Sequence, residues 1–146
     1  MYWPADVQRA EKSYLHKKLL NSNFFINQLF SMKKRFKIKR KEEFQKIIKA
    51  RKRLVGKGFI VYYSQPLNVS NDRVGISVSK KLGNAVVRNR IKRQVRMMVG
   101  EITDFHNGLD VIIIVRNDYL TRSFDENKKE LLKLYESVYN IFAAEK

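Results

Sequence analysis

The chain has 146 residues, with 31 Lys and Arg against 14 Asp and Glu, so its formal net charge is +17. It has no cysteine, which excludes disulfides, thiol catalysis and cysteine-based zinc sites. Its longest apolar run, 111–115, is far shorter than the ~20 residues of a membrane-spanning helix, and no signal-peptide pattern opens the chain. We therefore expect a cytoplasmic protein with one main domain and no membrane partner.

The excess positive charge is concentrated in the middle of the chain. Residues 32–71 carry 13 basic and two acidic residues, and residues 72–96 carry eight basic residues and one acidic residue. Residues 97–146 instead carry six basic and nine acidic residues. A local field of this kind is typical of proteins that bind nucleic acid or an anionic membrane.

Residues 1–31 differ from the rest, because their charge is mixed and their apolar residues are not clearly periodic. We expect them to form an N-terminal extension, mostly disordered, ahead of a functional start at Met32. His16 in this segment has no partner at a metal-ligand or catalytic spacing and is interpreted as incidental.

The first elements expected after Met32 are a helix and two strands. A short helix over 41–50 carries Phe44, Ile47 and Ile48 on one side, although no capping residue precedes it. In the strand 58–64, Phe59, Val61 and Tyr63 share one face, while Ile60 and Tyr62 share the other. The strand 73–79 alternates the inward residues Val74, Ile76 and Val78 with Gly75, Ser77 and Ser79.

The most distinctive stretch runs from Lys80 to Arg96, KKLGNAVVRNRIKRQVR, where seven of 17 residues are basic and none is acidic. Asn84 can cap a helix, and Gly83 allows the sharp change of direction before it. At 100° per residue, one stripe is apolar and packs on a sheet; it contains Val87, Ile91, Val95, Met98, Val99 and Ile102. Unrelieved like charges at i, i+4 destabilise a helix, so a polyanionic partner explains the other face better than solvent alone.

After a turn at 103–108 that contains His106, Leu109–Val115 is expected to be a central strand buried on both faces. Ser123 and Glu126 form a capping box that opens a helix to about Phe142. We interpret Asp104, Asp110 and Asp118 as solvated, because their spacing suits no metal. The pattern predicts an α+β sandwich with the helices on one side of a small sheet.

Two features suggest RNA as the partner. Basic residues in 33–57 and 80–96 can hold a phosphate backbone, and the aromatic residues Phe44 and Tyr62 can stack on unpaired bases at ~1–3 kcal/mol per base. A core role is twice as common for a residue such as Phe44, and the two roles are evenly balanced for Tyr62. No catalytic triad, metal-ligand cluster or phosphate loop is present in the sequence, so we expect no catalytic residue and no metal site in the protein.

The stretch KKLGNAVVRNRIKRQVR, together with the basic start, the FQK helix and the RVGISVSKK strand, resembles the signature of the bacterial ribonuclease P protein subunit. The resemblance covers Met32 to about Phe142, which defines 32–146 as a ribonuclease P protein domain. It implies a two-layer fold with a four-stranded sheet and about three helices, in the order α-β-β-β-α-β-α, with a left-handed βαβ crossover. That order contains one strand more than the three located above.

The resemblance also implies two sets of site residues. The basic helix would face the RNA subunit; with the two lysines before it, the RNA-binding set is Lys80, Lys81, Arg88, Asn89, Arg90, Lys92, Arg93 and Arg96. A cleft between the first helix and the sheet would bind the 5′ leader of precursor tRNA through Phe44, Ile48, Tyr62, Lys92 and Arg96. Relatives often carry a second aromatic residue where this chain has Ile48.

The implied activity is that of the protein component of an endoribonuclease that removes the 5′ leader from precursor tRNA. In this interpretation Mg²⁺ bound to the RNA subunit performs the hydrolysis, and the protein raises substrate affinity and lowers the Mg²⁺ requirement. The partners would be the RNA subunit and precursor tRNA, with no small-molecule substrate and no cofactor bound tightly by the protein. A ribosomal or general structured-RNA-binding protein is the main alternative, and a protein-only nuclease is a second one.

Overall fold

The structure is a computed structural model that describes residues 36–66, 70–102 and 107–145. The chain divides into two units, 1–31 and 32–146, and every described residue belongs to the second. The predictions for residues 1–31, His16, Asp104 and His106 fall outside the described residues. Within the described ranges, no helix is both long and apolar enough to cross a membrane.

A four-stranded mixed sheet forms the centre of the described unit. Its strands are β1 (Arg53–Val55), β2 (Phe59–Ser64), β3 (Arg73–Val78) and β4 (Asp110–Val115), in the spatial order β1-β2-β4-β3. β4 pairs antiparallel with β2 and parallel with β3, so its predicted central position is confirmed. β1 is the strand that periodicity did not locate, because it is only three residues long and follows a run of basic residues.

Two helices cover one face of the sheet. α4 (Ala85–Ile102) and α5 (Phe124–Glu145) pack against the odd-numbered residues of β2 and β4, such as Phe59 and Ile113, which are fully buried. From α4 this core receives Ile91, Val95, Met98, Val99 and Ile102, with Val87 partly buried beside them. The predicted apolar stripe of the basic helix is therefore confirmed.

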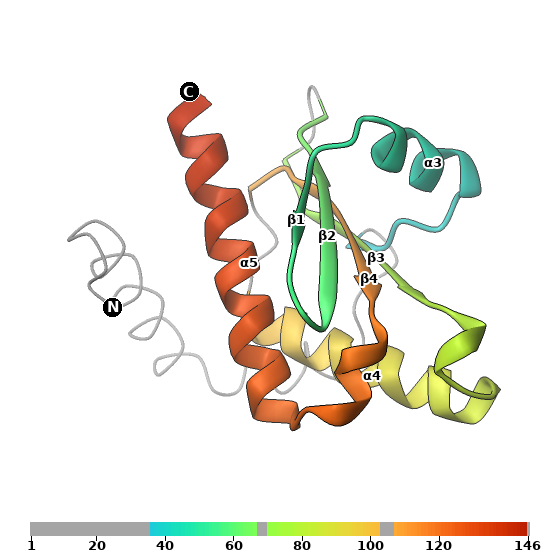
Figure 1. Ribbon diagram of the computed structural model, residues 1–146. Helices are drawn as coiled ribbons and strands as arrows, with labels where there is room; N and C mark the ends of the chain where they lie inside the picture. The colour runs from blue at the N-terminus through green and yellow to red at the C-terminus, as the bar shows by residue number, and fades with distance from the viewer. Residues whose placement is uncertain (1–35, 67–69, 103–106, 146) are drawn as a thin grey trace, which may run out of the picture. The chain divides into compact units, whose positions relative to one another are not determined.

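The third helix, α3 (Lys41–Lys49), covers the opposite face of the sheet (Figure 1). Ile47 packs there with Tyr62 and Ile112 in a second, smaller apolar cluster. The prediction that all helices lie on one side is wrong. The central strands place apolar side chains on both faces, and a second helix layer is needed to bury those of the even-numbered positions.

The connection from β3 to α4 follows the sequence prediction closely. After the short helix η2 (Lys80–Leu82), Gly83 has a φ of 148°, a value that side chains disfavour. Asn84 Oδ1 then accepts a hydrogen bond from the Val87 amide at 3.0 Å, which confirms the predicted N-cap. α4 joins the parallel neighbours β3 and β4; the left hand of this crossover stays a prediction from the family resemblance.

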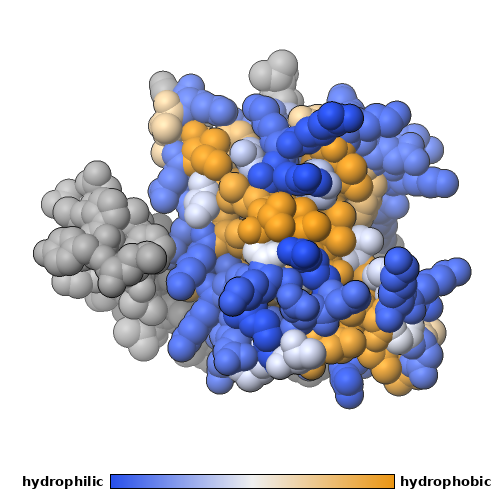
Figure 2. Space-filling view, viewed as in Figure 1, coloured by the Kyte–Doolittle hydropathy of each residue, from blue (hydrophilic) through white to orange (hydrophobic). Residues whose placement is uncertain are grey.

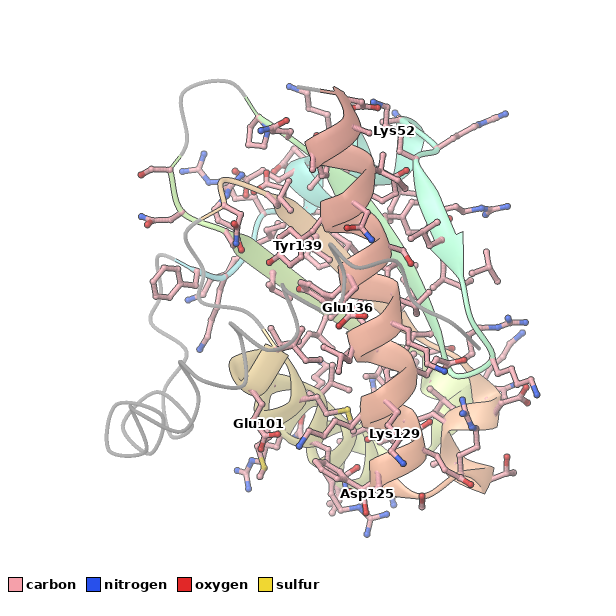
Figure 3. All side chains as sticks on the ribbon, turned by 90° about the vertical axis from the view of Figure 1, so that its left-hand side faces the viewer. Lys52, Glu101, Asp125, Lys129, Glu136 and Tyr139 are labelled. Carbon is pink, nitrogen blue, oxygen red and sulfur yellow. The ribbon has the colours of Figure 1, made fainter. Side chains whose placement is uncertain are left out.

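α5 starts with the predicted capping box. The Glu126 amide donates to Ser123 Oγ at 3.2 Å, and the Ser123 amide donates to Glu126 Oε2 at 3.0 Å. The helix is preceded by η3 (Asn117–Thr121), which Tyr119 anchors in the core through an edge-on contact with the ring of Phe59. The start of α5 is also tied to α4 by an ion pair between Lys128 and Glu101, and Figure 3 shows Glu101 beside α5.

Candidate nucleic-acid interface

The outer side of η2 and α4 forms a continuous cationic surface. Because the apolar stripe of α4 faces the core, the basic residues between its members point away from the sheet. Lys80, Lys81, Arg90, Arg93 and Arg96 are exposed. The structure therefore places the sequence-predicted RNA-binding residues on one side of one helix and its leading turn. Asn89 is exposed as well, whereas Arg88 and Lys92 are partly buried.

This cationic surface is not neutralised by the rest of the described chain. None of the ion pairs found among the described residues involves a Lys or Arg of 80–96. The Nε atom of Arg88 is also buried and has no hydrogen-bond acceptor among the described residues, an arrangement that proteins usually avoid. An external anion would relieve the charge repulsion along α4.

The residues predicted to stack on the leader, Phe44, Ile48 and Tyr62, lie on the other side of the sheet. Phe44 and Ile48 of α3 are partly buried, and Tyr62 of β2 is only 8% exposed. Arg53 also contacts Tyr62. Arg53 Nη1 donates to the Tyr62 hydroxyl at 3.2 Å, and the guanidinium carbon lies 6.0 Å from the ring centroid. The structure thus places Tyr62 mostly in the core, with its polar edge next to a cation.

The two parts of the predicted leader site are not brought together by the described contacts. Phe44, Ile48 and Tyr62 belong to the apolar cluster under α3. Lys92 and Arg96 lie on α4, which packs against the opposite face. The sequence analysis identified the residues of both groups. The structure shows that the two groups belong to opposite faces of the sheet.

A strip of the sheet beside α3 was located only in part by the sequence analysis, which put Ser77 on the outward side of its strand but did not connect it with Ile60. Ile60 pairs with Ile114, which in turn pairs with Ser77, and all three are partly exposed. Ile60 shares its face with Tyr62, so strand alternation was a signal that could have located this strip. Its two isoleucines pack against the same apolar cluster as Phe44.

A three-residue ionic cluster fixes α3 over the sheet. Arg73 of β3 binds Asp110 with two hydrogen bonds, from Nε at 2.9 Å and from Nη2 at 2.7 Å, and its Nη1 binds Glu43 of α3 at 3.0 Å. These bonds, led by that to Asp110, raise the pKa of Arg73 above its usual range, so it remains charged. The prediction that Asp110 is solvated is wrong, since it is 4% exposed and paired; Asp118 is exposed as expected.

The described residues offer no metal centre. Within 36–66, 70–102 and 107–145, no group of three or more His, Asp or Glu side chains is arranged to hold an ion. Asp72, the other buried carboxylate of the sheet region, accepts hydrogen bonds from the amides of Asn107 at 3.0 Å and Leu109 at 2.9 Å. It therefore fixes the entry to β4 and has a structural role.

The sequence model of the Ribonuclease P family matches residues 32–139. The chain belongs to the ribonuclease P protein family. A ribonuclease P protein component of Bacillus cereus (strain AH187) is 41% identical over 105 residues, which is 71% of this chain and 91% of that protein. The family match spans the sheet, α3, α4 with its cationic stretch, and α5 as far as residue 139.

Solved structures of the family share the fold. The ribonuclease P protein of Staphylococcus aureus superimposes with a TM-score of 0.65 at 32% identity, covering 70% of this chain and 94% of that one. The protein of Thermotoga maritima superimposes with a TM-score of 0.57 at 28% identity, covering 67% and 93%. The α+β fold with a four-stranded mixed sheet and three helices is therefore the fold of the ribonuclease P protein family.

Proposed function

We propose that this protein is the subunit of ribonuclease P that binds the catalytic RNA and helps it to remove the 5′ leader from precursor tRNA. The observation that carries the proposal is the cationic surface of η2 and α4, whose charges have no ion-pair partner within the described residues. Helical basic residues at a spacing of i, i+4 can follow an RNA backbone, and each phosphate contact releases counterions. Family membership supports the choice of this RNA over others.

We assign the chemistry to the RNA and the positioning to the protein. Mg²⁺ held by the RNA subunit would supply the activated nucleophile. The basic residues of α4 would screen the repulsion between the RNA subunit and its RNA substrate, which lowers the Mg²⁺ concentration needed for activity. The carboxylates of Glu43 and Asp110 are engaged by Arg73, so we give them no catalytic role.

The single-stranded leader would lie on the sheet beside α3. The strip of Ile60, Ile114 and Ser77 is partly exposed, and its two isoleucines share an apolar cluster with Phe44. An unpaired base can cover such an apolar surface, and the small side chain of Ser77 leaves room for it. Tyr62 would contribute through its hydroxyl edge and Arg53, since little of its ring is accessible.

The proposal is tested by cleavage of a 5′-labelled precursor tRNA at low Mg²⁺. The three reactions contain the protein alone, the RNA subunit alone, and both together. We expect cleavage at the mature 5′ end only in the mixture. Cleavage by the protein alone would mean that it carries its own active site, and no stimulation in the mixture would reject the assignment to ribonuclease P.

A general structured-RNA-binding protein is separated from this proposal by its substrate preference. Such a protein would bind precursor and mature tRNA equally well, because the phosphate backbone carries no information on the leader. The subunit proposed here should favour the precursor when it is bound to the RNA subunit. Competition between the two tRNAs for the assembled complex measures this preference directly.

A further inference from the structure

An open groove lined mostly by charged residues lies at the end of the sheet where β1 turns into β2, away from α3 in the view of Figure 1. It has a volume of about 660 Å³ and is formed by the β1–β2 turn, by the segment 116–122 after β4, and by the first turns of α5. We call it the hairpin groove. In the view of Figure 2, apolar side chains gather over the β1–β2 hairpin and hydrophilic ones lie below it, over the segment that leads into α5.

The walls of the hairpin groove are fixed by bonds between these three parts. Glu130 of α5 accepts hydrogen bonds from the amides of Lys57 at 2.6 Å and Gly58 at 2.9 Å, and it pairs with Arg122 at 2.9 Å. Arg116 Nη1 donates to the carbonyl of Gly56 at 2.7 Å. The carboxylate of Glu130 is thus fully engaged by bonds within the protein, and these bonds hold the three parts of the groove together.

The remaining charges favour an anion. Lys57, Lys129 and Lys133 are exposed and take part in none of the ion pairs of the described residues, and Arg116 is bonded only to a carbonyl. They are opposed by two carboxylates, of Asp118 and of the capping residue Glu126. Figure 3 shows Lys129 on α5, one turn after Asp125. Four cations against two carboxylates attract a polyanion without a fixed, enclosed ligand site.

The groove reaches the β1 edge of the sheet, where it meets the cross-strand row that contains the strip beside α3. Val55 lines the groove and is 57% exposed. It pairs with Ile60, which pairs with Ile114, so these residues form one cross-strand row. Arg116 follows β4 directly and lies in the groove. A chain that lies along this row and passes around the edge strand β1 at Val55 would reach the groove on the α5 side of the sheet.

We infer that the hairpin groove binds the phosphates of single-stranded RNA that extends beyond the sheet strip, namely the upstream part of a long 5′ leader. This inference rests on the proposed function. The contacts would be made to the backbone through Lys57, Arg116, Lys129 and Lys133, so they would not depend on the base sequence. They would add affinity only for leaders long enough to reach the groove.

The test compares precursor tRNAs with a short and a long leader, bound to the complex of the protein with its RNA subunit. The variant Lys129→Ala/Lys133→Ala should weaken binding of the long-leader substrate roughly 2–10-fold, as expected for two exposed charge contacts, and leave the short-leader substrate unchanged. The slope of log affinity against log salt should fall by about 0.7 per lost contact, for the long leader only. Thermal unfolding of the free variant checks that the fold is intact.

Two single variants form a matched pair. Asp118→Asn removes a negative charge from the groove and should tighten binding of the long-leader substrate. Glu145→Gln removes a negative charge from the exposed far end of α5, which does not line the groove, and should have no effect. A change that is equal for both leaders, or absent for both, would overturn the inference. If the wild-type protein fails to stimulate cleavage at all, the proposed function itself has failed instead.

Discussion

The ring of Phe44 lies directly against the backbone of Gly75. A Cβ atom at position 75 would be 2.5 Å from Cζ and 2.7 Å from Cε2 of that ring, closer than real Cβ atoms approach. The absence of a side chain at Gly75 therefore sets how deeply α3 sits on the sheet. It also sets the distance between Phe44 and the strip of Ile60 and Ile114.

Gly75→Ala should lift α3 from the sheet. Overpacking of this kind costs about 1–3 kcal/mol of unfolding free energy, and the displaced Phe44 should reduce affinity for precursor tRNA more than for mature tRNA. The matched control is Gly100→Ala in α4, where an added methyl meets no atom within 4 Å. A glycine-to-alanine change inside a helix should stabilise the protein by about 0.5–1 kcal/mol. Urea unfolding and tRNA competition measure both effects, and equal behaviour of the two variants would contradict the argument.

The two carboxylates bound to Arg73 should contribute unequally to the free energy of unfolding. Asp110→Ala leaves a partly buried guanidinium without its two-bond partner and should cost about 1–3 kcal/mol in urea unfolding. Glu43→Ala removes a single, partly exposed contact and should cost less than about 1 kcal/mol. Its main effect should be a looser α3, seen as faster hydrogen exchange in 41–49 than in the sheet. Equal losses of stability would mean that Glu43 is as important to the fold as Asp110.

Comparison of sequence and structure shows where local patterns were sufficient. Asn84 and the Ser123–Glu126 box were predicted because caps depend on neighbouring residues only. The position of α3 was not, because a helix with an apolar side does not reveal which face of a sheet it covers. Asp110 was misinterpreted for the same reason: its partner Arg73 is 37 residues away and becomes a neighbour only through parallel pairing of β3 with β4.

The candidate site was also predicted only where it depends on residues close together in the sequence. The exposed basic residues of α4 follow from helical periodicity, which the sequence displays directly. The burial of Tyr62 depends on Arg53 and α3, and the hairpin groove depends on Glu130 meeting the amides of Lys57 and Gly58 more than 70 residues away. No spacing rule within one element contains these contacts.

The double variant Arg88→Ala/Arg93→Ala should weaken assembly with the RNA subunit. If both residues contact phosphates, the slope of log affinity against log salt should fall by up to about 0.9 for each. Arg88→Lys/Arg93→Lys is the matched control, because it keeps the charge and should keep the slope, although the shape of the contact changes. A slope that is unchanged in the alanine variant would remove these two residues from the RNA interface.

Tyr119 should make the stability of the fold sensitive to alkaline pH. Its hydroxyl donates to Gln94 Oε1 at 2.8 Å, and burial raises its pKa to about 12, partly opposed by the positive charge of Arg90. Unfolded tyrosine has a pKa of about 10, so between pH ~10 and ~12 the unfolded chain loses a proton that the folded protein keeps. The stabilisation is complete below pH ~10 and is lost as the pH rises.

Tyr119→Phe should cost about 1 kcal/mol at neutral pH through the lost hydrogen bond. Because Tyr135, whose pKa burial also raises, is present in both proteins, its effect cancels. The difference in unfolding free energy between the two proteins should therefore shrink through this window, and a constant difference would show that Tyr119 ionises equally in both states.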